Sequence, residues 1–335
     1  MKKSLIALAV AGVVAAPAAF AASANVDVYG TLRFSVDKVS SDVAANEKWN
    51  ISDRVSRIGF KGSEDLGGGM SAVYGMEWGV DITDNDASAT SDSPFSARNA
   101  FVGLKGAFGT VLAGKHDTPY KLAGSADLFG DTAADSQGSA GIIGYGNFDL
   151  RATNALAYIS PDWNGFHFAA AVTNNGTATT NGANISDSTS LALVYVNGPL
   201  KATYGYENHG DKTLSATTED ATAGEKASKF NVAYKIGDIA LGYTYEKQDR
   251  QLTTDADATN QLGSIAYGMG PITLAAQYGQ RDSKVAANDK KRTTLGVIYA
   301  LSKRTSAALA YNSDKDGSGT TTKLNTTTLQ LNHAF

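Results

Sequence analysis

The chain has 335 residues, a formal net charge of −4, 42% hydrophobic residues and no cysteine. The lack of cysteine excludes disulfides, thiol catalysis and cysteine-ligated metals, and without a basic stripe nucleic-acid binding has no support. Beyond residue 21 no run of eighteen apolar residues occurs, which excludes transmembrane helices.

The first 21 residues are expected to be a secretory signal peptide that is cleaved. Lys2 and Lys3 form a basic start, an apolar stretch covers 5–16, and residues 19–21 make a small-x-small cleavage site. Residues 22–24 offer a second such site, so cleavage after Ala24 stays open. Residues 22–335 are then one exported domain, and loss of the two lysines takes the formal charge from −4 to −6.

Alternating apolar and polar residues follow, in about sixteen segments. In the first segment, 26–37, one face carries only apolar side chains and the other carries the charges: Val26, Val28, Leu32, Phe34 and Val36 against Asp27, Tyr29, Arg33 and Asp37. The same split recurs at 200–207, 239–246 and 272–281. One uncharged face and one charged face are typical of a barrel with lipid outside and water inside.

The connections between these segments alternate in length. Seven are short, at 64–69, 106–109, 160–165, 197–199, 237–238, 268–271 and 302–303, and most of them hold the Gly, Pro, Asn or Asp that tight turns need. Eight long ones are polar, near 39–48, 84–94, 118–148, 174–188, 208–226, 250–259, 282–290 and 312–322. A soluble β-sandwich would show no such alternation, whereas outer-membrane barrels are connected in this way.

The last segment, 327–335, alternates to its aromatic end. Leu329, Leu331, His333 and Phe335 share one face. We expect it to be the sixteenth strand, closing against 26–37. The prediction is an all-β fold, a 16-stranded antiparallel transmembrane β-barrel.

Several stretches resemble the general diffusion porins of Gram-negative outer membranes, especially the neisserial-type branch. They are Tyr29-Gly30, 56–62 (Ser-Arg-Ile-Gly-Phe-Lys-Gly), 64–67 (Glu-Asp-Leu-Gly), 98–106 (Arg-Asn-Ala-Phe-Val-Gly-Leu-Lys-Gly), 108–111 (Phe-Gly-Thr-Val), 117–120 (Asp-Thr-Pro-Tyr), Ser160-Pro161 with Gly165, and 333–335 (His-Ala-Phe). The resemblance implies a homotrimer in outer-membrane lipid that passes ions and small hydrophilic solutes passively and needs no cofactor. It also implies that Phe335 is part of the signal read by the barrel-assembly machinery.

Sixteen strands enclose an aqueous lumen, which must be narrowed to be selective. The longest connection, 118–148, is too long for a casual loop. In the resembling family this third loop folds inward, and its carboxylates face basic residues of the wall. The acidic candidates here are Asp127, Asp131 and Asp135, and which of them lines the pore stays open. The basic candidates are Arg57 and Arg98 by motif, Arg151 beside a matched strand, and more weakly Arg33 and Lys115.

The alternatives to a general diffusion channel include an enzyme and a substrate-selective channel. An outer-membrane enzyme would need a catalytic set, but of His116, His167, His209 and His333 only His116 has an acidic neighbour, and no metal-ligand spacing occurs. We therefore predict no enzymatic activity. A substrate-selective channel for a sugar or another small nutrient is the alternative to a general diffusion channel, and the preference for anions or cations stays open.

Overall fold

The computed structural model describes residues 25–42, 47–83, 93–138, 141–174, 186–210, 224–250, 256–317 and 323–335. The expected signal peptide lies outside these residues. In the described part no helix is both long and apolar enough to cross a membrane.

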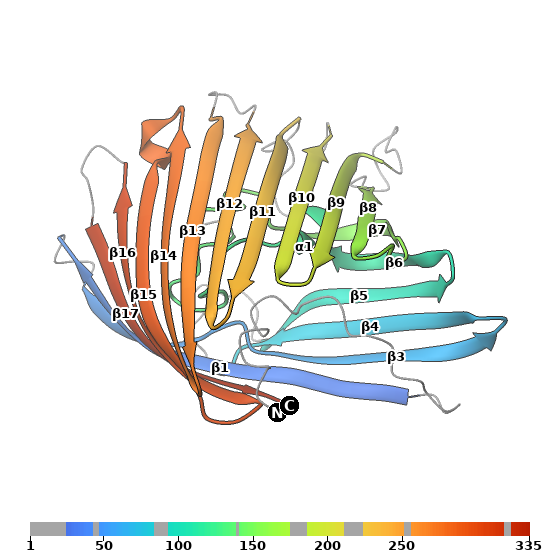
Figure 1. The fold of residues 1–335 in the computed structure, drawn as a ribbon, viewed down its shortest axis with the longest axis horizontal. Coiled ribbons are helices and arrows are strands. Elements are labelled where there is room, and N and C mark those ends of the chain that lie inside the picture. Colours follow the sequence, from blue (N-terminus) through green and yellow to red (C-terminus); the bar gives the residue numbers. More distant parts are fainter. Residues whose placement is uncertain are drawn as a thin grey trace.

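Strands make up most of the chain (Figure 1). Their bounds are β1 (Asn25–Ser41), β2 (Lys48–Asp53), β3 (Arg57–Gly67), β4 (Met70–Val80), β5 (Phe95–Gly106), β6 (Gly109–Asp117), β7 (Arg151–Ile159), β8 (Phe166–Thr173), β9 (Ser188–Asn197), β10 (Leu200–His209), β11 (Lys226–Ile236), β12 (Ile239–Asp249), β13 (Ala258–Met269), β14 (Ile272–Ser283), β15 (Lys290–Ala300), β16 (Thr305–Asp316) and β17 (Lys323–Ala334). A helical turn, α1 (Pro119–Leu122), follows β6, and a 3₁₀ turn, η3 (Ala286–Asn288), precedes β15.

The strands form one closed antiparallel barrel. From β3 onward each strand pairs with the next, and β17 pairs with β1 from Thr31–Ala334 to Ser41–Leu324. Strands β2 and β3 both lie along the same edge of β1 and act as one strand, interrupted where Val55 adopts a positive φ of 58°. With β2 and β3 counted together, the barrel has sixteen strands, which confirms the predicted fold.

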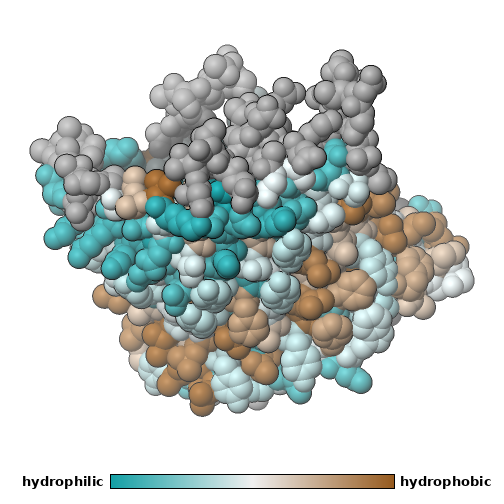
Figure 2. Space-filling model, turned by 90° about the horizontal axis from the view of Figure 1, so that it is seen from above, coloured by the Kyte–Doolittle hydropathy of each residue, from teal (hydrophilic) through white to brown (hydrophobic). Residues whose placement is uncertain are grey.

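The two faces of the wall differ as the alternation predicts. On β1, Val26 and Val28 are 52% and 56% exposed, whereas Ser35 and Asp37 point inward and are 0% and 1% exposed. An apolar band lies below a polar band on the face seen in Figure 2. The apolar residues therefore cover the outside of the barrel, where lipid is the solvent, and polar residues line the inside.

Connections alternate in length as predicted. Two residues, Gly68 and Gly69, join β3 to β4, and Gly237 and Asp238 join β11 to β12. Gly68, Gly69 and Gly237 all have positive φ, which glycine adopts without steric cost. The longest connection runs from β6 to β7, over 118–150.

Barrel closure brings Phe335 onto Gly30. The Gly30 amide donates to the Phe335 carbonyl at 3.1 Å, and the Phe335 amide donates to the Gly30 carbonyl at 3.0 Å. A Cβ added at Gly30 would lie 2.3 Å from Cζ of the Phe335 ring and 2.6 Å from the Arg57 carbonyl oxygen. The ring of Phe335 therefore needs glycine beneath it.

Candidate functional site

Connection 118–150 contacts the inward-facing side chains of β12 to β14. The Tyr120 hydroxyl donates to Glu246, the Ala126 amide donates to Thr244 Oγ1 at 2.7 Å, and the Leu128 amide donates to Gln277 Oε1 at 2.9 Å. Glu246, Thr244 and Gln277 are buried, while their neighbours Tyr243, Tyr245 and Tyr278 are exposed on the outer face. These hydrogen bonds attach the connection to the inner side of the wall.

Aromatic packing adds a second attachment. Phe129 is buried against Ala134, Ala275 and Ala310, and a Cβ at Gly296 would lie 2.5 Å from its ring. Small residues on β14, β15 and β16 therefore leave room for the ring of Phe129 to pack against the inner wall.

The carboxylates of Asp127 and Asp135 form hydrogen bonds with backbone amides of connection 118–150 itself. Asp127 accepts hydrogen bonds from the amides of Phe129 and Ser136, both at 3.0 Å, and Asp135 accepts from the amides of Asp131 and Gln137 at 2.8 and 2.7 Å. Burial, reinforced by the adjacent Asp127 carboxylate, raises the pKa of Asp135 well above its usual range. Both carboxyl groups thus hold the local conformation of the chain.

Asp131 has a different position. Its backbone has a positive φ of 58°, and its carboxylate forms an ion pair with Arg33 of β1. The same oxygen, Oδ2, lies 3.4 Å from Nη1 of Arg57 on β3. Of the three predicted aspartates, Asp131 is the one that contacts the predicted arginines.

Glu77 on β4 links Arg57 to Arg98. The Nε–H of Arg98 donates to Glu77 Oε1, and Nε of Arg57 lies 3.9 Å from Oε2 of the same carboxylate. We did not predict this residue. The sequence could have indicated it, because Glu77 is the sole charged residue in 70–80. It lies between Met76 and Trp78, so alternation places its side chain on the face opposite to these two apolar side chains.

A β-bulge turns Arg98 into the barrel. Val102 and Leu104 face outward, so strict alternation would turn Arg98 outward as well. The register of β4 with β5 shifts between Met76 and Trp78, and Ala97 and Ala100 on either side of the bulge are both exposed. The extra residue leaves Arg98 and Asn99 together on the inner face.

Arg151 on β7 forms a further ion pair, next to Asn99. Its Nη2 lies 3.1 Å from Oδ1 of Asp117, and its Nε donates to Oδ1 of Asn99 at 2.7 Å. Asp117 also pairs with Lys121 at 3.4 Å. Lys115, by contrast, lies at a register shift between Gly114 and His116 and forms no ion pair with a described carboxylate.

Arginines and carboxylates therefore alternate along one side of the lumen. In order they are Arg33, Asp131, Arg57, Glu77, Arg98, then Asn99, Arg151 and Asp117, on β1, the connection, and β3 to β7. Fixed charges that face water in a confined space set ion preference and create a local field. Within the described ranges no group of three or more His, Cys, Asp or Glu side chains could hold a metal ion.

Comparisons with known proteins agree with this architecture. The family model described as Gram-negative porin matches residues 6–319. Outer membrane porin protein 32 of Delftia acidovorans is 32% identical over 95% of this chain and 91% of its own length. The major outer membrane protein P.IB of Neisseria lactamica is 29% identical over the whole of both chains.

Solved structures share the fold. The anion-selective porin from Comamonas acidovorans superposes with a TM-score of 0.75 at 24% identity, covering 93% of this chain and 100% of that one. The in-vitro folded OmpT of Vibrio cholerae, in its trimer form, superposes with a TM-score of 0.68 at 19% identity, covering 94% and 100%.

Proposed function

This chain belongs to the Gram-negative porin family, and we propose that its channel is narrowed where Asp131 of connection 118–150 meets the arginines of the wall. The protein is an outer-membrane channel for passive diffusion, and porins are channel proteins rather than enzymes. Ions and small hydrophilic solutes are its cargo. The narrowing, its residues and their effect on selectivity are the proposal.

The ion pair of Asp131 with Arg33 carries this proposal. It joins the connection to β1, whereas the hydrogen bonds to Glu246, Thr244 and Gln277 join the same connection to β12 and β14. A segment held at both sides spans the lumen and leaves less room for solutes. Water and ions would pass beside the row of charges.

The roles of the predicted residues then differ. We propose that Arg33, Arg57, Arg98 and Arg151 line the narrow part together with Asp131 and Glu77. Asp127 and Asp135 would shape the connection, and a pore role for Lys115 stays a prediction. Four arginines and Lys121, against the carboxylates of Asp131, Glu77, Asp117 and of Asp149 (which also pairs with Lys121), leave one excess positive charge, which favours anions.

A cysteine at position 131 tests the narrowing, because the chain has no native cysteine to react. We expect a bulky methanethiosulfonate reagent to lower the single-channel conductance of Asp131→Cys stepwise, since the adduct would occupy the passage. Lys303→Cys, in the exposed turn between β15 and β16, is the matched control and should keep its conductance after labelling. If labelled Asp131→Cys conducts like the unlabelled channel, the narrowing lies elsewhere.

We also propose a homotrimer, because the similar OmpT structure is a trimer form. The expected result is a band near three times the monomer mass on a gel without boiling, which collapses to the monomer after boiling. A monomer band in both lanes after mild detergent extraction would contradict the trimer.

A further inference from the structure

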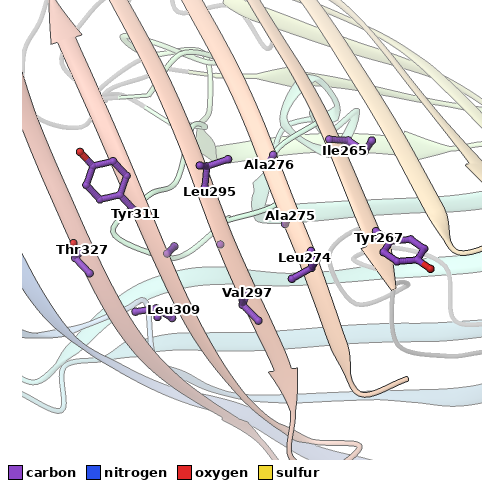
Figure 3. Close-up of a pocket in the computed structure, with 12 residues that line it drawn as sticks. Ile265, Tyr267, Leu274, Ala275, Ala276, Leu295, Val297, Leu309, Tyr311 and Thr327 are labelled. Atoms are coloured by element: carbon purple, nitrogen blue, oxygen red, sulfur yellow. The ribbon is translucent and has the colours of Figure 1, made fainter. Parts of the chain in front are cut away.

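Two aromatic side chains of the wall face the lumen instead of the lipid. On the outer face, Tyr267 and Tyr311 line an open groove of about 550 Å³ among leucine side chains (Figure 3). Tyr29 has the opposite orientation, because it shares the inward parity of Arg33 on β1, whose register has no shift. Phe101 follows the bulge of β5 and lies on the inner face as well. Both side chains are half-buried.

Each of these rings lies over a glycine of a neighbouring strand. A Cβ added at Gly59 of β3 would lie 2.5 Å from Cζ of Tyr29, and a Cβ added at Gly75 of β4 would lie 2.8 Å from Cε1 of Phe101. Gly59 is the register partner of Glu77, and Gly75 precedes Glu77 by two residues, so both positions share its inward parity. One side of each ring therefore lies against the backbone, and the other side faces the water of the lumen.

The two rings are neighbours on the inner wall. Gly59 and Gly75 are diagonal partners in the register of β3 and β4, and diagonal positions on one face of a sheet lie about 7–8 Å apart, within the reach of aromatic side chains. His116 of β6 extends the surface, because it packs edge-on against Phe101 with ring centroids 5.1 Å apart. Tyr29 and Phe101, called the ring pair below, thus make one aromatic surface in the lumen.

The ring pair adjoins the row of charges on the side of the short turns. Gly59 lies two residues from Arg57 along β3, and Gly75 lies two residues from Glu77 along β4. A rise of two residues is about 7 Å, a span that a single-ring carboxylate covers. The Tyr29 hydroxyl interacts with Glu77, which also pairs with Arg57. Excess positive charge and an aromatic surface therefore lie next to each other in the lumen.

The charged groups on the far side of the ring pair offset each other. Nζ of Lys61 lies 5.3 Å from the centroid of the Tyr29 ring, and its side chain is exposed. Asp27 of β1, which is also exposed, stands opposite Lys61 in the register. These two residues add no net charge, so the excess of the arginine row decides which ions reach the ring pair. An exposed lysine has a flexible stem and can move off the ring when a solute arrives.

From this arrangement we propose that Tyr29 and Phe101 form a binding subsite for aromatic carboxylates, with the carboxylate group turned toward Arg57 and Arg98. The subsite rests on the proposed function of the charged row and adds a preference among anions of equal charge. Guanidinium groups hold carboxylates by charge-assisted hydrogen bonds, and a pair of aromatic rings in offset or edge-on contact adds about two- to tenfold in affinity. An aliphatic carboxylate meets the same charges without the ring contact.

The test compares benzoate with cyclohexanecarboxylate, which carry the same charge on rings of similar size. Each anion is titrated into KCl on either side of a single channel in a planar bilayer, and the concentration that halves the conductance is measured. The wild type should need several-fold less benzoate than cyclohexanecarboxylate. Tyr29→Leu/Phe101→Leu keeps apolar side chains over the two glycines but removes both rings, so it should raise the benzoate value on the order of tenfold and bring the ratio of the two anions to about one.

Further variants separate the ring pair from the charged row. Tyr267→Leu/Tyr311→Leu removes two rings from the outer face and is the matched control, with the ratio of the wild type. Arg57→Gln/Arg98→Gln should weaken both anions together, so a failure of the charged row leaves the absolute values unchanged there and does not touch the ratio. If the double leucine variant fails to fold, Phe101→Leu alone should still raise the benzoate value about threefold.

The ratio of the two anions decides the proposal. Equal half-blocking concentrations of benzoate and cyclohexanecarboxylate in the wild type would overturn it, because the rings would then only cover the glycine backbone. A ratio that survives in the leucine variants, single or double, would overturn it as well.

Discussion

Neutralising Arg57 and Arg98 together is expected to shift the reversal potential of the channel toward cations. Both arginines contact Glu77, and Arg57 also contacts Asp131. The double variant Arg57→Gln/Arg98→Gln removes two positive charges from a row with one in excess, so one negative charge is left in excess. Unit charges about 4 Å apart interact by about 1 kcal/mol even in bulk water, so the permeability ratio should change on the order of tenfold.

The measurement is the zero-current potential across a planar bilayer with a KCl gradient. Lys303→Gln/Arg304→Gln removes the same charge from an exposed turn and should leave the potential unchanged at physiological salt, where exposed charges are screened. Adding Glu77→Gln to the double variant removes the excess negative charge and should move the potential back toward anions. An unchanged potential in the double variant would show that these arginines do not set selectivity.

Deleting Phe335 is expected to lower the amount of protein in the outer membrane far more than it lowers the conductance of each channel. The residue lies on the outer face, 42% exposed, whereas the charged side chains of the row lie on the lumen side of the wall. It forms two backbone hydrogen bonds with Gly30 at the seam, and we propose that it is also read by the assembly machinery. The deletion removes both contributions.

Two variants separate these contributions. Phe335→Ala keeps the backbone hydrogen bonds and removes the ring, so a loss of yield in this variant assigns the effect to the ring. Gly30→Val keeps Phe335 but places a side chain where its ring lies, at 2.3 Å from Cζ, and tests the seam alone. Yield is measured by quantitative immunoblot of outer-membrane fractions, and conductance by single-channel recording. If the variant without Phe335 reaches the outer membrane in full yield, Phe335 has no role in assembly.

The row of charges was only partly predictable from sequence. Arg33 could be placed inward because it alternates with Leu32 and Phe34 on a regular strand. Arg98 could be assigned by motif but not by alternation, since the bulge at Arg98 and Asn99 reverses the parity of the strand. The choice of Asp131 over Asp127 and Asp135 depends on how connection 118–150 folds, and this follows from its contacts with β12 to β16.

The sequence by itself determined the sixteen-stranded barrel and its two faces, because alternation, turn chemistry and solvent preference are local properties of the chain. The cleaved signal at 1–21 and the assembly role of Phe335 stay predictions from the same source. Tertiary structure decided which charges meet: Glu77 with two arginines, and Asp131 with Arg33. The physical reason is register, since a shift of one residue between paired strands turns a side chain from water to lipid.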